Sequence, residues 1–250
     1  ETTVNYNRDV EIFPVLRAIF DRIFGKCPYQ SPTDMGVNMA GNCIIDDEAC
    51  CEASRQEIIR RYYQAVDGLA DETKTQDEVF KIELLMKQAN ISLEDRKVTV
   101  AAKKRAEETG APAAAVELDD GRIITGKTSD LLGAASALLL NALKDLAGLP
   151  HNLHVISPAS IEPIQKLKTS YLGSKNPRLH TDEILIALSS TAAHNENAKK
   201  AMGELTKLKG CDAHSTVLLS SVDETTFKKL GMQLTCEPKY EEDGRKYHKH

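Results

Sequence analysis

Residues 113–147 constrain the fold of this chain more than any other stretch. Residues 113–118 are typical of a strand, residues 119–121 of a tight turn whose glycine supplies a positive φ, and residues 122–125 of the returning strand. The helix predicted from about residue 129 to 147 is apolar nearly all round, so it should be buried between layers. A hairpin that leads into a buried helix favours an α/β arrangement.

The same stretch contains a match to the Walker A motif. Residues 121–128 read G-R-I-I-T-G-K-T and satisfy G-x-x-x-x-G-K-[ST] in full. A working P-loop follows a buried strand and has small residues at its variable positions, so that backbone N–H groups can surround phosphate oxygens. Ile123 and Ile124 are β-branched and belong on a pleated strand instead. We therefore expect no nucleoside-triphosphate loop here.

A weaker anion site remains at the predicted start of the helix. Lys127, Thr128 and Ser129 would stand at its N-terminus, where free N–H groups, the helix dipole and a lysine favour an anion. We predict that these three residues bind a ligand, with Lys127 as the first contact. The alternative is that Thr128 or Ser129 simply caps the helix.

Composition excludes several classes of function. The 250 residues carry a net charge of −5 and a pI near 5.9, which gives no electrostatic reason to expect nucleic acid as a partner. No apolar run is long enough to span a membrane, and the start shows neither an initiator Met nor a signal peptide. We expect a cytoplasmic protein without a membrane partner, whose chain begins partway through a longer one.

The cysteines indicate no cofactor. The chain has six, without a C-x-x-C pair, so reduced cytosolic thiols are the expectation. Cys211 and His214 have the spacing of metal ligands, but no second pair lies near them, so a buried thiol is favoured and no metal site is predicted. The cofactor stays unknown.

The first part of the chain is predicted to be entirely helical, which gives a domain at residues 1–110 with an irregular loop at 31–42. Pro14 is tolerable only in the first turn of its helix. Ser92 with Asp95 forms a weak capping box. The apolar spacing predicts helices at residues 9–24, 46–65, 79–87 and 92–109.

After residue 110 the pattern alternates between strands and helices. This predicts an α/β sandwich with a mixed sheet at residues 111–240, followed by a charged tail at 241–250. Beyond the hairpin and the buried helix, we expect a strand at 153–156, a helix at 160–171, two further helices, a strand at 215–220, a helix at 224–230 and a last strand through residue 234.

Two further stretches hold residues suited to chemistry. Arg178 is of the type suited to a phosphate or carboxylate, and His180, just before a predicted helix, is of the residue type that exchanges protons near neutral pH. A helix cap with a solvated arginine explains the same residues equally well. His214 precedes a predicted strand and is either a second proton-transfer group or a loop residue.

Several stretches carry a resemblance to a known family: T-V-N-Y-N-R-D at 3–9, S-P-T-D-M-G-V-N-M-A-G at 31–41, Q-E-I-I-R-R-Y-Y at 56–63, N-P-R-L-H-T-D-E at 176–183 and K-L-K-G-C-D-A-H-S at 207–215. Together they resemble one bacterial family, the domain of unknown function 1846. The resemblance spans essentially the whole chain and implies no established activity. Proteins of that family look about twice this long, which implies that this chain is the carboxyl half and that the upstream half is a partner.

A second resemblance concerns architecture. The order hairpin, buried helix, strand, helix over residues 113–171 is similar to the cytidine-deaminase-like fold, in which a His or Cys at the first helix and a Pro-Cys-x-x-Cys after the next strand hold zinc. This chain has T-S-D-L at 128–131 and S-P-A-S-I at 157–161. The resemblance therefore implies that fold without its zinc ligands.

Two hypotheses of function follow. In the first, the chain is an enzyme, or half of one, that binds a small anionic metabolite or nucleotide through Lys127, Thr128, Ser129 and Arg178, with His180 and His214 for proton transfer. In the second, the chain is a non-catalytic module that assembles a homo-oligomer.

Overall fold

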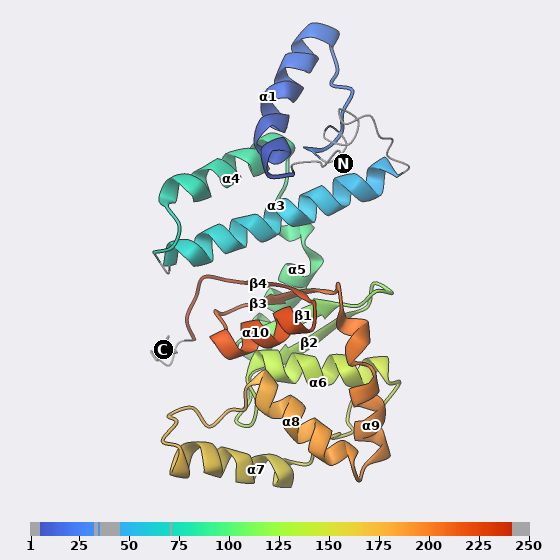
Figure 1. Cartoon of the computed structure of the whole chain (residues 1–250), viewed down its shortest axis with the longest axis vertical. Helices are drawn as coiled ribbons and strands as arrows, with labels where there is room; N and C mark the ends of the chain where they lie inside the picture. The colour runs from blue at the N-terminus through green and yellow to red at the C-terminus, as the bar shows by residue number, and fades with distance from the viewer. Residues whose placement is uncertain (1–5, 33–34, 36–45, 71, 242–250) are drawn as a thin grey trace, which may run out of the picture. The chain divides into compact units, whose positions relative to one another are not determined.

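The chain folds into two compact units, Glu1–Arg96 and Lys97–His250. The structure is a computed structural model that describes residues 6–32, 35, 46–70 and 72–241. In Figure 1 the first unit is drawn in blue to blue-green and the second in green to red.

Described helices of the first unit confirm the helical prediction for this part of the chain. They are α1 (Tyr6–Phe24), α3 (Asp47–Ala70), α4 (Gln76–Ala89) and a 3-10 turn, η1 (Leu93–Asp95) (Figure 1). A core cluster lies between α3 and α4, and its buried members are Ile58, Ile59, Tyr63, Leu85 and Met86.

Two details of these helices differ from prediction. Because α1 begins at Tyr6, Pro14 lies in its interior rather than in its first turn. The helix predicted over 92–109 is divided: the Ser92 N–H does donate to Asp95 Oδ2 (2.9 Å), but the chain turns extended at the buried Arg96. The predicted loop at 31–42 lies largely outside the described residues.

The second unit begins with α5 (Lys97–Thr109), which packs on the sheet and therefore belongs to this unit, although the sequence changes character only at residue 110. It continues with β1 (Ala113–Glu117), β2 (Ile123–Lys127), α6 (Ala134–Leu146), α7 (Pro158–Lys166), a π-helical turn η2 (Leu167–Tyr171), α8 (Thr181–Ala192), α9 (Glu196–Gly203), η3 (Leu205–Leu208), β3 (Asp212–Ser215), α10 (Ser221–Lys229) and β4 (Gln233–Cys236).

Within the described residues the strands form one mixed sheet of order β2-β1-β3-β4, as the sequence predicts for the fold class. β1 is antiparallel to both β2 and β3, and β3 is parallel to β4. β2, β3 and β4 therefore all end at the edge where β1 begins. We call this the carboxyl edge, and it is marked by Lys127, Ser215 and Cys236.

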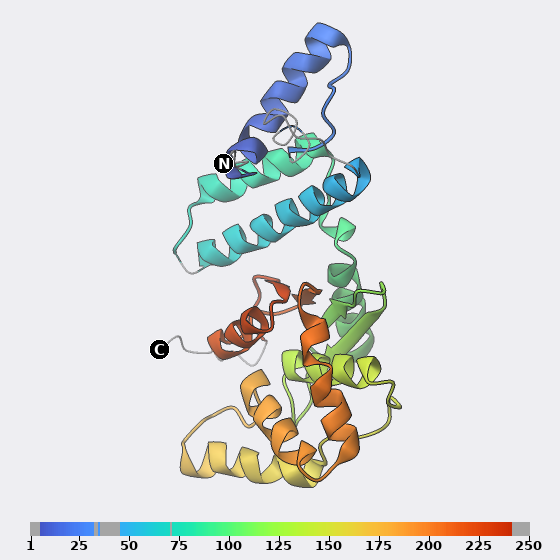
Figure 2. The ribbon, with the colours of Figure 1, turned by 45° about the vertical axis from the view of Figure 1, so that its right-hand side comes forward.

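Helices cover both faces of this sheet, with α5 on one face and α6 on the other (Figures 1 and 2). Strand residues alternate between the two cores. Ala114, Val116 and Ala213 belong to the large core that contains α6, whereas Ala115 packs with Val98 of α5. The unit thus has the layers of an α/β sandwich.

The strand predicted at residues 153–156 is wrong. These residues form an irregular loop, although Val155 and Ile156 are buried in the large core. Their apolar character reflects packing rather than sheet pairing. The strand predicted at 215–220 is displaced, because β3 ends at Ser215 and Ser220 caps α10. The helices expected at 160–171 and 224–230, the last strand and the hairpin turn, with Gly121 at φ 80°, are confirmed.

The backbones of β2 and α6 approach closely at Gly126. A Cβ atom there would lie 2.1 Å from Leu138 N and 2.7 Å from Ala137 C, closer than non-bonded atoms can approach. The amide of Asn141 donates to Thr125 O (2.9 Å) beside this contact. The glycine of the Walker-like G-K-T is therefore explained by helix packing.

We predict that Gly126→Ala will lower the free energy of unfolding by about 3 kcal/mol, because overpacking would push α6 off the sheet. Gly203→Ala is the matched control, since a Cβ atom at Gly203 meets nothing within 4 Å and should change stability by no more than about 0.5–1 kcal/mol, in the stabilising direction. Urea unfolding measures both. Equal stability of the two variants would contradict the packing argument.

Candidate functional site

One segment lies across the carboxyl edge and contacts the loop that follows each of its three strands. Leu179 N–H donates to Leu131 O (3.0 Å), in the loop after β2. His180 Nδ1 lies 3.2 Å from Ser220 Oγ, in the loop after β3. Arg178 Nη1 lies 2.6 Å from Glu241 Oε1, beyond β4. Three consecutive residues thus converge where α/β proteins commonly bind ligands.

The centre of the site is a hydrogen-bonded cluster of His180, Asp223 and Ser220. His180 Nδ1 lies 3.0 Å from Asp223 Oδ2, and the Ser220 hydroxyl donates to the same oxygen (2.8 Å). The Thr181 N–H donates to Asp223 Oδ1 (2.8 Å). Because Oδ2 can only accept from the ring, Nδ1 carries a proton and Nε2 is the basic nitrogen of the neutral imidazole.

The buried Asp223 carboxyl is held as an anion. Burial by itself would raise its pKa, but the hydrogen bond and charge of His180, the Thr181 N–H and the Ser220 hydroxyl together outweigh burial and hold the pKa below its usual range. The His180 ring therefore faces a fixed negative charge at Nδ1.

A second cluster supports the backbone of the segment from behind. Lys168, buried in η2, donates to Arg178 O (2.7 Å) and to Glu183 Oε2 (2.8 Å). Glu183 Oε2 also accepts the His180 N–H (2.8 Å). The backbone at Arg178 and at His180 is thus held, directly or through Glu183, by the buried ammonium group of Lys168.

The loop after β2 does not form the predicted helix terminus. α6 begins at Ala134 with Gly133 as its N-cap, so Lys127, Thr128 and Ser129 precede the helix and do not cap it. The Thr128 N–H donates to Pro112 O (2.8 Å), and the Ser129 N–H donates to Leu132 O (2.9 Å). These two amides are used inside the fold, because the chain makes a turn before it enters α6.

Lys127 and His214 lie on the face of the sheet that α5 covers. Gly126 faces α6, so the next residue, the exposed Lys127, points to the α5 side. His214 follows Ala213, which packs in the α6 core, and is buried on the α5 side. Of the predicted site residues, the structure brings together Arg178, His180 and the loop containing Ser129.

His214 has structural partners on that face. Its Nδ1 lies 2.9 Å from Thr235 Oγ1, and its Nε2 lies 3.5 Å from Glu237 Oε1. Glu237 also binds Lys103 of α5 (2.8 Å). The imidazole therefore links β3 and β4 to the helix that covers them.

The metal-like spacing of Cys211 and His214 does not produce a site, because Cys211 packs in the core on the α6 side. Burial, together with the Asp119 carboxylate, raises the pKa of its thiol to about 11. Among the residues that the structure describes, no group of three His, Cys, Asp or Glu side chains is arranged to hold a metal ion.

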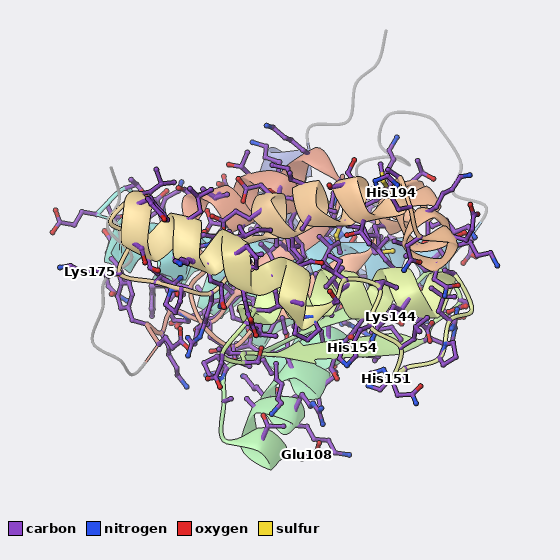
Figure 3. All side chains as sticks on the ribbon, turned by 90° about the horizontal axis from the view of Figure 1, so that it is seen from below. Glu108, Lys144, His151, His154, Lys175 and His194 are labelled. Atoms are coloured by element: carbon purple, nitrogen blue, oxygen red, sulfur yellow. The ribbon has the colours of Figure 1, made fainter. Side chains whose placement is uncertain are left out.

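The remaining described histidines, His151, His154 and His194, lie outside the His180 cluster. His151 and His154 lie on the same side as Lys144, whose Nζ donates to His151 O (2.9 Å), and His194 lies apart from them (Figure 3). No helix in the described part of the chain is both long and apolar enough to cross a membrane.

The chain matches both parts of one protein family. Residues 94–245 match the C-terminal part of the domain of unknown function DUF1846, and residues 1–90 match its N-terminal part. The expectation of a carboxyl half alone is corrected accordingly, because both parts are present.

Similar proteins occur in several bacteria. The chain is 56% identical to a UPF0371 protein of Corynebacterium efficiens over 243 residues, which is 96% of this chain and 49% of that protein. It is 54% identical to a UPF0371 protein of Streptococcus uberis over 243 residues, 97% of this chain and 49% of that protein. The chain spans about half the length of the curated relatives it matches.

We predict that Asp223→Asn will destabilise the chain by about 3 kcal/mol at pH 7, because the amide keeps the shape but loses the charge that His180 and Thr181 bind. The folded pKa of Asp223 lies below its unfolded value, so its stabilisation is complete above about pH 4 and is lost as the pH falls.

Urea unfolding at pH 7 and at about pH 3 measures this difference. The control is the exposed Asp182→Asn, because Asp182 lies in the first turn of α8 as Asp223 lies in the first turn of α10. The deficit of Asp223→Asn should shrink at the lower pH. A deficit that is independent of pH would show that the charge of Asp223 contributes nothing.

Proposed function

The chain belongs to the DUF1846 family, and for this chain we propose an acid–base enzyme that acts on a small anionic metabolite at the carboxyl edge of its sheet. The observation that carries the proposal is the convergence of Arg178, Leu179 and His180 on the three loops that follow β2, β3 and β4.

Arg178 supports the anionic nature of the substrate. Its guanidinium binds the Glu241 carboxylate at 2.6 Å, and both side chains are partly exposed. A planar guanidinium binds carboxylate and phosphate groups in the same way. We propose that the Glu241 carboxylate stands where an anionic group of the substrate binds, and that the substrate displaces it.

His180 supports the proton transfer. Asp223 fixes the Nδ1 proton, and the proposal assigns the proton exchange with substrate to Nε2. Asp223 stabilises the imidazolium that forms, and Ser220 with the Thr181 N–H keeps the carboxylate in place. Lys168 acts through the backbone and is a positioning residue.

The likeness to the cytidine-deaminase-like fold also stays a proposal. The hairpin, the buried α6 and the mixed sheet support it, but the next strand after α6 is β3 and the next helix after that strand is α10. The place of the second set of zinc ligands is then residues 219–223, which contain Ser220 and Asp223 and no cysteine. His180 with Asp223 would take over the proton transfer.

The test is a melting-temperature screen of the chain against phosphate, sugar phosphates and nucleotides, each with and without Mg²⁺. A ligand at a hundred times its dissociation constant adds about 2.7 kcal/mol, or roughly 5 °C for a chain of this size. We expect Arg178→Gln to abolish the shift, and Glu241→Gln to enlarge it at subsaturating ligand because the competing carboxylate is gone.

Lys127→Ala is the matched control, because this lysine lies at the same edge but on the other face. Its shift should equal that of the wild type. The ligand found is then incubated with His180→Gln, which should bind it but convert it about 10²-fold to 10⁴-fold more slowly. A shift retained in Arg178→Gln, or no shift with any compound, would refute the proposal.

The assembly hypothesis has one observation in its favour. α1 exposes an apolar stripe, Ile12, Val15, Ile19 and Ile23, whose spacing places all four side chains on one face of the helix. We propose that a second copy of this chain covers the stripe, since identical helices can pair through such a surface.

We predict that Val15→Glu/Ile19→Glu will convert a dimer into a monomer in sedimentation equilibrium, because both side chains would carry charge into the contact. Val100→Glu on α5 is the control for an exposed apolar residue outside the stripe and should leave the dimer intact. A wild-type chain that is monomeric at every concentration would exclude this function.

A further inference from the structure

A cavity of about 410 Å³ lies in the first unit, apart from the residues described so far as a site. It is lined by residues of α1, of the chain that follows α1, of α3, and of the end of α4. Its volume is within the range of sites for small molecules.

The floor of this cavity is apolar. Phe13 of α1, Cys27 and Ile58 of α3 all line it and are buried. Tyr29, Ala89 and Ile91 also line the cavity and are only half-buried, so they offer accessible apolar surface to a ring or short aliphatic body. The apolar part of a ligand would therefore lie against them.

The rim is cationic. Arg17, Lys26 and Arg55 line the cavity, and Asp21 is the one carboxylate among its lining residues. Asp21 is partly satisfied by the backbone, because its Oδ1 accepts the Cys27 N–H (2.7 Å), and its contact with Arg17 is long, 4.0 Å. Within the described part of the chain, Lys26 forms no ion pair.

Among the described residues, the third cation of the rim, Arg55, pairs with an exposed carboxylate. Arg55 Nη1 binds Glu52 at 3.1 Å, and both side chains are about half exposed, so solvent screens the pair. A ligand anion that enters the cavity can exchange for such a partner at little cost. The charges of the lining residues thus favour an anion over a cation or a neutral molecule.

We infer that this cavity binds a small molecule with an apolar ring or chain and one phosphate or carboxylate group. The apolar body lies on Tyr29 and Ile91. The anionic group lies between Arg17 and Arg55, with Lys26 nearby. This site is independent of the one at the carboxyl edge, since none of its residues belongs to the second unit.

Isothermal titration of the whole chain with phenyl phosphate tests the inference. We expect saturable binding, with benzyl alcohol and inorganic phosphate each binding at least tenfold more weakly, because each lacks one half of the recognised chemistry. Arg17→Gln/Arg55→Gln should weaken phenyl phosphate binding at least tenfold. Both arginines are exposed enough for the variant to keep its fold, which circular dichroism checks.

Arg178→Gln separates the two proposals. It should leave phenyl phosphate binding in the cavity unchanged even if it abolishes binding at the carboxyl edge. The inference is overturned if phenyl phosphate shows no saturable binding, if the double variant binds it as tightly as the wild type, or if Arg178→Gln alone removes it.

Discussion

The second unit depends on the contact between the backbone of α6 and the backbone of β2 at Gly126. Only a residue without a Cβ atom lets Leu138 approach so closely. That approach allows the apolar α6 to fill the space beneath the sheet, and the chain makes a turn before α6 begins at Ala134. The resulting turn places Leu131 and Leu132 beside Leu179, which brings the candidate segment over the strand ends.

Charge at the carboxyl edge is arranged around buried groups of opposite sign. Asp223 is a buried anion that faces His180, and Lys168 is a buried cation that faces Glu183 and a carbonyl group. Each would be costly to bury alone and is stabilised by several hydrogen bonds. The outer groups, Arg178 and Glu241, are paired nearer to solvent, where exchange with a ligand is less costly.

Local patterns in the sequence predict much of the fold, because the hairpin, the apolar α6 and most helices are determined by near neighbours. The strand predicted at 153–156 fails because burial without pairing gives the same apolar signal as a strand. In the candidate site, Arg178 and His180 are identifiable by residue type, whereas Asp223 follows His180 by 43 positions and resembles an ordinary first-turn acid. Nothing local distinguishes Lys168, since its burial depends on the later segment it contacts.

The strand order also has a consequence for the sequence of folding events. β1 pairs with β2 across a turn of a few residues, but its other neighbour is β3, and Ala114 meets Ser215 about a hundred residues later. Closing so long a loop costs chain entropy, so the hairpin and α6 are expected to form early and β3 with β4 late. The carboxyl edge is complete only after that last step, and the loops of the candidate site are therefore among the final parts of the unit to assemble.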